Sequence, residues 1–174
     1  MRISSAAKTL FFKLYTSRLP VKAWLYALRE ACVMSVNCRL YRTPETIGHY
    51  FILCIGAAFF WDISQRTIKK DIGITPYRIR FLPVEKNCVV PYDLFMLLGL
   101  FSLSKSRIMD RHAELPRLSK SMFREHCALV RGVYAASEEP PSWLPYLDAC
   151  VPPSLLMFWK EGSCRGKVAW CFVA

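Results

Sequence analysis

The chain has 174 residues, of which 53% are hydrophobic, and it carries a formal net charge of +11. This length is sufficient for one domain with a hydrophobic core. The two longest apolar runs, residues 50–61 and 94–103, are shorter than the ~20 residues of a membrane-spanning helix and predict buried helices instead. An excess of Lys and Arg on so apolar a chain favours a polyanionic partner, such as nucleic acid or anionic lipid.

The N-terminal region is basic, because the first 29 residues contain six Lys or Arg side chains and no acidic one. This composition is similar to that of a mitochondrial transit peptide, whereas no segment has the pattern of a secretory signal. Eight cysteines without a secretory signal favour reduced thiols over a disulfide framework. We therefore expect an intracellular, reducing compartment, the nucleus or the cytoplasm.

Helical spacing of apolar residues predicts two helices near the N-terminus. Residues 10–15 predict a short helix that ends near Ser17. A second helix is predicted to begin near Pro20, because proline fits a first helical turn, and to reach about Cys32.

A strong helix start is predicted at Thr43, where threonine can cap, Pro44 fits the first position and Glu45 favours the positive end of the helix dipole. This helix is expected to run to about Lys70. Its expected apolar face consists of Ile47, Phe51, Cys54, Ile55, Ala58, Phe59 and Ile63.

The second half of the chain predicts two further helices. Residues 73–87 contain two prolines and are expected to be irregular, whereas residues 92–112 and 120–136 have helical periodicity. Residues 149–174 have no steady period and are expected to form an unpatterned tail. The buried face of the last helix is predicted to hold Phe123, Cys127, Val130 and Tyr134.

These elements predict a mainly α protein. We expect a small helical domain of four to five helices, with a degenerate zinc-knuckle-like turn and an irregular loop insertion. The predicted organisation is basic N-terminal helices at 1–35, the knuckle-like segment at 36–58, a helical C-terminal region at 59–148 and the tail at 149–174.

The run VNCRLYRTPETIGHYFILC contains a candidate metal site. A C-x2-C-x7-H-x4-C pattern supplies four zinc ligands, and here Cys38, His49 and Cys54 occupy three of the places. Tyr41 stands in the second place, where a phenol with a pKa near 10 is a poor zinc ligand. Cys32, at the end of the preceding predicted helix, is a candidate substitute. The cofactor expected from this set is zinc, bound weakly or lost.

The spacing of the last two ligands raises a geometric problem. On an ideal α-helix, five residues separate His49 from Cys54 by about 140°, so both can face one ion only across a distorted turn. The competing interpretation is that Cys54 is a buried core thiol, His49 a surface residue and Cys38 incidental.

The segment PETIGHYFILC resembles the zinc-binding segment that follows the polymerase domain in non-LTR (LINE-like) retrotransposon proteins. That family places Cys-Cys-His-Cys ligands at this spacing, which correspond here to Cys38, Tyr41, His49 and Cys54. LFFKLYTSRLPVKAWL, FFWDISQRTIKKD, TPYRIRFLPVE and VPYDLFMLLGLFSLSKSRIMDRHAE are similar to the C-terminal region of tick-transposon-like elements. The likeness covers about residues 10–148.

Two departures from the family accompany this likeness. Tyr41 replaces a ligand cysteine, and Ser104, on the apolar face of the helix predicted at 92–112, stands where the family tends to carry tryptophan. The chain therefore resembles an eroded, truncated copy of such a protein, and an open reading frame without a functional product is one interpretation.

Catalysis is not expected from this chain. The Tyr-x-Asp-Asp motif of the family's polymerase is absent from the sequence, and Glu85, Lys86 and Asp93 are too few to predict a nuclease. His112 and His126 are expected at the surface of basic helices.

The resemblance implies a non-catalytic nucleic-acid-binding fragment with RNA or DNA as its partner. Tyr41 and Tyr77 are candidates for stacking on bases, and the same charges could instead form a solvated face. The alternative function is a basic, apolar, membrane-associated or organelle-targeted small protein. The predicted nucleic-acid-binding residues are Arg39, Arg42, Lys69, Lys70, Arg78 and Arg80.

Overall fold

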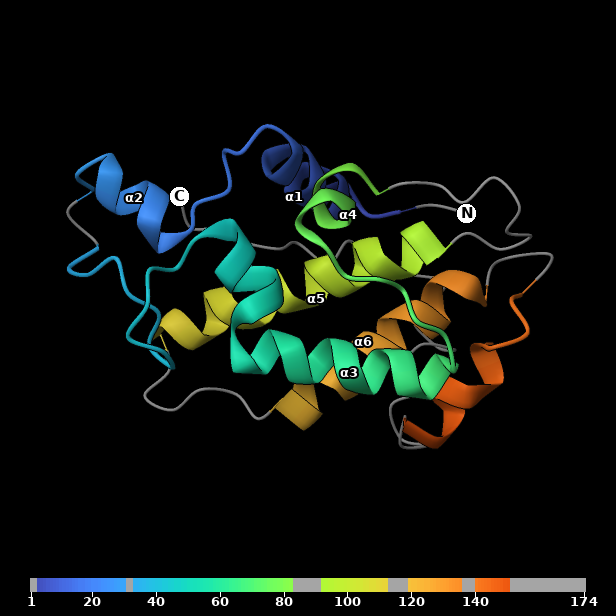
Figure 1. The fold of residues 1–174 in the computed structure, drawn as a ribbon. Coiled ribbons are helices and arrows are strands. Elements are labelled where there is room, and N and C mark those ends of the chain that lie inside the picture. The colour runs from blue at the N-terminus through green and yellow to red at the C-terminus, as the bar shows by residue number, and fades with distance from the viewer. Residues whose placement is uncertain (1–2, 31–32, 83–91, 113–118, 136–139, 151–174) are drawn as a thin grey trace.

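The computed structural model describes residues 3–30, 33–82, 92–112, 119–135 and 140–150 (Figure 1). Within these residues the backbone forms six α-helices, a π-helical turn and a 3-10 helix, which confirms the mainly α class with slightly more helices than predicted. The elements are α1 (Ser5–Tyr15), α2 (Lys22–Ala27), η1 (His49–Leu53), α3 (Ile55–Ile68), α4 (Pro76–Phe81), α5 (Tyr92–His112), α6 (Ser119–Tyr134) and η2 (Leu144–Cys150).

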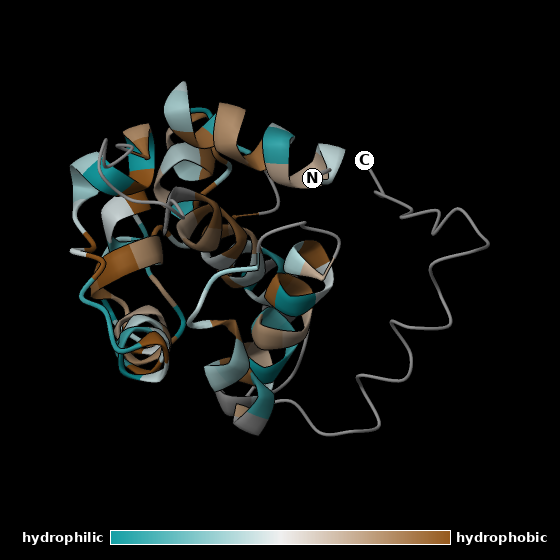
Figure 2. Cartoon of the chain, turned by 90° about the vertical axis from the view of Figure 1, so that its right-hand side faces the viewer, coloured by the Kyte–Doolittle hydropathy of each residue, from teal (hydrophilic) through white to brown (hydrophobic). Residues whose placement is uncertain are grey.

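Helix α5 is the centre of the fold. Residues 94–100 are all buried, because α1 and α4 lie on one side of α5 and α6 packs along another (Figure 1). The packing is close: a β-carbon at Gly99 would lie 2.5 Å from Cη2 of Trp61. The outer helices carry both hydrophilic and hydrophobic residues, as expected for helices that pack on one side and meet solvent on the other (Figure 2).

The predicted helix start at Thr43 is wrong. Pro44 forms an isolated antiparallel bridge with Asn37, and residues 43–45 are not helical. The cap is Thr46, whose side-chain oxygen accepts a hydrogen bond from the backbone N–H of His49 at 3.2 Å. Pairing with an earlier segment of the chain thus overrides the local start signal and moves the helix start downstream.

The predicted face of the following helix is correct as far as Cys54 and only in part after it, where Ile63 still packs against the core. Phe51 and Cys54 are buried as expected, but Ile55 and Phe59 are 58% and 46% exposed. The helix does not run straight through, because Cys54 has an extended ψ of 134° between η1 and α3. This break rotates the second segment and buries another set: Ala57, Phe60, Trp61, Ser64 and Ile68.

Two further predictions are wrong. Part of the segment expected to be irregular forms α4, where Pro76 occupies the first turn and the Thr75 side chain accepts a hydrogen bond from the backbone N–H of Arg78. His126, expected at the surface, is fully buried. It lies on the same face of α6 as Phe123 and Val130, because side chains three or four positions apart share a face.

Helices α5 and α6 agree closely with their predicted ranges, and the predicted buried face of α6 is confirmed. Of the helices that the structure describes, none is both long enough and apolar enough to cross a membrane. The predicted tail beyond residue 150, the side chain of His112 and the residues Cys32, Glu85 and Lys86 lie outside the described parts of the chain.

Candidate metal centre

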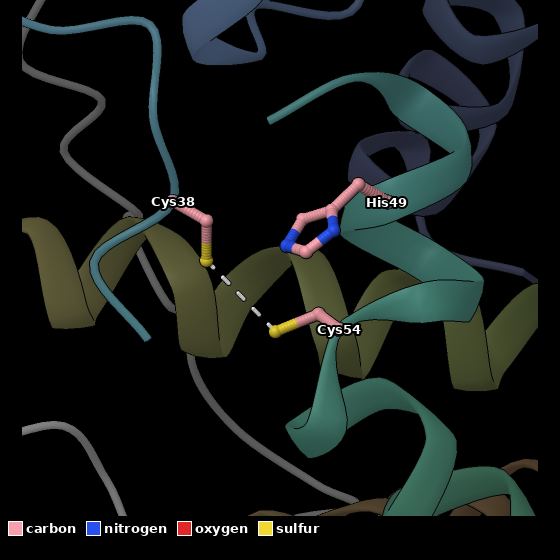
Figure 3. A group of neighbouring side chains, drawn as sticks. All are labelled: Cys38, His49 and Cys54. Carbon is pink, nitrogen blue, oxygen red and sulfur yellow. Dashed lines mark hydrogen bonds between the residues drawn. The ribbon is translucent and has the colours of Figure 1, made fainter. Parts of the chain in front are cut away.

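Three predicted ligands, Cys38, His49 and Cys54, converge in the interior of the described structure (Figure 3). One ligand atom from each lies within 4.8 Å of the others, and all three residues are buried. The two sulfur atoms are 4.0 Å apart. The group could therefore hold a metal ion. The competing interpretation is wrong on two points: His49 is buried and does not lie at the surface, and Cys38 lies beside the other two residues.

A short extended loop positions Cys38. The backbone N–H of Cys38 donates to the carbonyl of Thr43 at 2.9 Å, and that of Glu45 donates to the carbonyl of Val36 at 2.9 Å. Lys22, at the start of α2, donates its backbone N–H to the Glu45 carboxylate at 3.2 Å and its ammonium to the carbonyl of Asn37 at 2.9 Å. The loop is thus closed on itself and tied to α2.

The π-helical turn η1 brings the other two ligands together. The backbone N–H of Cys54 donates to the carbonyl of His49 at 2.8 Å, a bond between residues five apart. A π turn places residues five apart nearly one above the other, whereas an ideal α-helix separates them by about 140°. The distorted turn that the sequence required for a shared ion is therefore present, between His49 and the break at Cys54.

The surroundings of His49 favour the neutral imidazole and the ring orientation that a metal ligand needs. Its Nδ1 lies 3.4 Å from the hydroxyl oxygen of Thr43, whereas its buried Nε2 has no hydrogen-bond partner among the described residues. The ring points toward the two sulfurs (Figure 3). Burial and then the charge of Arg107 lower the pKa of His49, against the opposing charge of Glu45, and so favour the neutral imidazole that binds metals.

The distance between the two sulfurs fits a tetrahedral ion. With Zn–S bonds of about 2.3 Å, two thiolates on one zinc ion lie about 3.8 Å apart, close to the 4.0 Å between Cys38 and Cys54. Two sulfurs and one imidazole nitrogen are a donor set that zinc prefers. This set leaves one coordination position open.

Arg107 on α5 lies against both sulfurs and was not predicted from the sequence. Its Nη2 donates to Sγ of Cys54, its Nη1 lies 4.0 Å from Sγ of Cys38, and its guanidinium carbon is 5.6 Å from the centre of the Tyr50 ring. Burial alone would lower the pKa of Arg107, but the hydrogen bond to Cys54 and the charges of both cysteines outweigh it and raise the pKa. No local pattern could reveal this residue, because it lies 53 positions beyond Cys54 in the sequence.

Tyr41 stands in the place of the fourth ligand and contacts the site through its ring. The side chain is 44% exposed, and its ring centre is 6.0 Å from that of His49 in an edge-to-face arrangement. In η1 itself, the hydroxyl of Tyr50 donates to the carbonyl of Ser104 at 3.3 Å, so the small residue at 104 leaves room for a polar contact with η1.

The predicted nucleic-acid-binding residues do not gather in one cluster. Arg39 and Arg42 are exposed on the loop that carries Cys38, whereas Lys69 and Lys70 follow the far end of α3, a helix of 14 residues and therefore about 21 Å long. Lys69 lies over the ring of Tyr146, 4.6 Å from its centre.

The remaining pair lies on α4, apart from both (Figure 1). Arg78 is half-buried and donates to the carbonyl of Ile72 at 2.6 Å, so this side chain holds the turn before α4. Arg80 is also half-buried and lines a small open cavity of about 200 Å³ between α4 and the start of the η1 segment, at Ile47 and Gly48.

Comparison with known proteins gives no match: no family model, no curated protein and no solved structure is similar to this chain at a significant level. The candidate metal centre therefore depends on its own geometry and on the chemistry of its donor atoms.

Proposed function

We propose that this chain is a non-catalytic nucleic-acid-binding module, of the kind found in the C-terminal region of non-LTR retrotransposon reverse-transcriptase proteins. In this proposal Cys38, His49 and Cys54 hold a structural zinc ion. The observation that supports it is the convergence of these three buried ligands on a π turn that nothing else in the local sequence requires.

The role of the ion follows from what the ligands join. Cys38 belongs to the extended loop at residues 36–45, whereas His49 and Cys54 belong to η1 and its end. An ion bound to all three would fix the loop on the helical core and would also fix Arg39 and Arg42, which are exposed on that loop. Ordering basic side chains in advance lowers the entropic cost of binding a polyanion.

Zinc content of the purified protein tests the metal part of the proposal. We expect one zinc ion per chain, a strong loss of affinity in Cys38→Ser and Cys54→Ser, and a gain in Tyr41→Cys, which restores a fourth ligand as a third thiolate. Cys150→Ser is the matched control, because Cys150 is a described cysteine in η2, outside the ligand group. Wild-type protein without zinc, or Cys38→Ser with unchanged zinc, would contradict the proposal.

Binding of labelled RNA and DNA oligonucleotides tests the nucleic-acid part. Because phosphate contacts release counterions, affinity should fall steeply between 50 and 200 mM salt, by roughly 10³-fold for about six contacts. Arg39→Gln together with Arg42→Gln should reduce both the affinity and the slope of this salt dependence. Absence of binding at low salt, or binding that is insensitive to salt, excludes this function.

A further inference from the structure

Four aromatic side chains form an exposed surface where α1 and α4 pack together, which we call the aromatic surface. They are Phe12, Tyr15, Tyr77 and Phe81, with 64%, 54%, 63% and 45% of each residue exposed. The rings of Tyr15 and Phe81 are 5.8 Å apart edge to face, and those of Tyr77 and Phe81 are 4.8 Å apart and tilted by 40°. Residues 66 positions apart in sequence thus build one continuous patch.

The aromatic surface differs in composition from the buried side of the same two helices. On the same two helices, the aliphatic side chains Leu10, Leu14 and Ile79 are all buried. The exposed large apolar residues of α1 and α4 are aromatic without exception. The exposed face of these two helices therefore presents aromatic rings, whereas their leucine and isoleucine side chains are buried.

The charge around this surface is positive. Neither α1 nor α4 contains an acidic residue, whereas each contains two basic residues. Lys8 lies four positions before Phe12 and seven before Tyr15, which places it on the same exposed face of α1. Arg80 precedes Phe81 and lines the adjoining cavity.

We propose that the aromatic surface is a stacking platform for the unpaired bases of single-stranded RNA or DNA, with Lys8 and Arg80 placed for the phosphates. This inference rests on the proposed nucleic-acid function and assigns it a site on α1 and α4, made of residues other than those of the metal-bearing loop. Proteins that bind single strands without sequence readout combine such aromatic rings with basic side chains.

An anionic membrane is the main competing partner, and the sorting of side chains argues against it. The apolar face of an interfacial helix combines Leu with Trp and Phe, and its aliphatic side chains enter the acyl boundary together with the rings. Here the aliphatic side chains of both helices face inward, and two of the four exposed rings are phenols. Bases have π faces that stack on such rings, whereas lipid tails make no use of ring orientation.

Leucine substitutions separate stacking from simple hydrophobic contact. Tyr15→Leu, Tyr77→Leu and Phe81→Leu keep an apolar side chain but remove the π face. We expect each substitution to weaken binding of a 30-nucleotide single-stranded oligonucleotide roughly five- to a hundredfold, as measured for loss of a base–aromatic stack elsewhere. Binding of a duplex of the same length should change little. Tyr26→Leu is the matched control, because Tyr26 is 54% exposed on α2, outside the aromatic surface.

The outcomes distinguish this inference from the proposed function. If wild-type protein binds oligonucleotides and the leucine variants bind equally well, the platform is excluded while the nucleic-acid function stands. If wild-type protein binds none, both are overturned. Unchanged oligonucleotide binding together with binding to phosphatidylserine vesicles would assign the surface to a membrane. Circular dichroism and zinc content verify the fold of each variant, and Tyr77→Leu, at the most exposed ring of α4, serves where either of the other two variants does not fold.

Discussion

His49 and His126 are both buried histidines, and their surroundings give them opposite roles. Both have a lowered pKa that is caused first by burial, and in both Nε2 lacks a hydrogen-bond partner among the described residues. His49 faces two sulfur atoms, whereas the His126 ring lies 5.0 Å from the ring centres of Phe60 and Phe95. A buried neutral imidazole is therefore not by itself a sign of a metal site; the neighbouring donor atoms decide.

The difference also appears in the hydroxyl groups that contact the two rings. Thr43 contacts Nδ1 of His49 from the loop that carries Cys38, so this contact links two ligands of the site. Ser102 lies 3.3 Å from Nδ1 of His126 and also donates to the carbonyl of Leu98, so this contact joins only α5 and α6. One histidine belongs to a group of residues that could hold a metal ion, and the other fills the core.

The largest expected effect is on zinc affinity, which substitution of His49 should change and substitution of His126 should not. His49→Phe should weaken zinc binding by more than the roughly 10–100-fold that loss of an outer-shell partner costs, because it removes one of three ligands. His126→Phe should leave zinc affinity unchanged. Competition with a chromogenic zinc chelator measures both, and equal losses in the two variants would contradict the assignment.

The second effect is a pH dependence of stability that is due to His126. Burial, against an opposing contact with the Leu98 carbonyl, lowers the pKa of His126 to about 3 from its ordinary 6.5. Between these values the unfolded chain binds a proton that the folded chain does not, so the free energy of unfolding falls as the pH falls, by up to about 1.4 kcal/mol per pH unit.

Urea titrations at pH 7, 6 and 5 measure this slope. His126→Phe should flatten the curve, because it removes the group that takes up the proton on unfolding. Metal-free samples are needed, since protonation of the zinc ligands also weakens zinc binding at low pH. A slope that persists unchanged in His126→Phe would assign the pH dependence to other groups.

The third effect concerns Arg107, the cation beside the two sulfurs. In metal-free protein, Arg107→Met should lower the free energy of unfolding by about 1–3 kcal/mol, the range for hydrogen bonds to charged groups. The same change should tighten zinc binding, because a dication then enters without a neighbouring guanidinium. Lys105→Met is the control, since its ion pair with Glu125 at 3.8 Å is nearly half-exposed on both sides and should contribute less than about 1 kcal/mol.

Arg107→Met is thus expected to lower the stability of the metal-free protein and to raise its zinc affinity, and this combination makes the prediction specific. A residue that only packs against the core would lower the stability of the metal-free and the zinc-loaded protein alike. Urea unfolding with and without zinc separates the two cases.

The smallest expected effect is on zinc affinity when the hydroxyl group that contacts each histidine is removed. Thr43→Val should lower zinc affinity roughly tenfold, because an outer-shell partner of the ligand His49 is lost. Ser102→Ala removes the corresponding contact of His126 and should leave zinc affinity unchanged. Equal effects of the two changes would show that Thr43 acts on stability alone.

Local patterns predicted the long helices well and the short or interrupted ones poorly. Helix α5 and the buried face of α6 follow from repeated apolar spacing over 21 and 16 residues. Helix α4 has only six residues, and its Pro and alternating Arg residues resemble an irregular segment. His126 was predicted at the surface because of its charged neighbours, although its spacing from Phe123 and Val130 already placed it on the buried face.

The sequence by itself determined the mainly α class, the three residues of the candidate metal centre and the need for a distorted turn between His49 and Cys54. Periodicity and spacing carry this information, because they depend on residues close together in the chain. Only the tertiary structure decided that Thr46 and not Thr43 begins the helix, that Arg107 lies against the sulfurs and that α1 and α4 join their aromatic rings. These features depend on contacts between segments far apart in sequence, which no local pattern records.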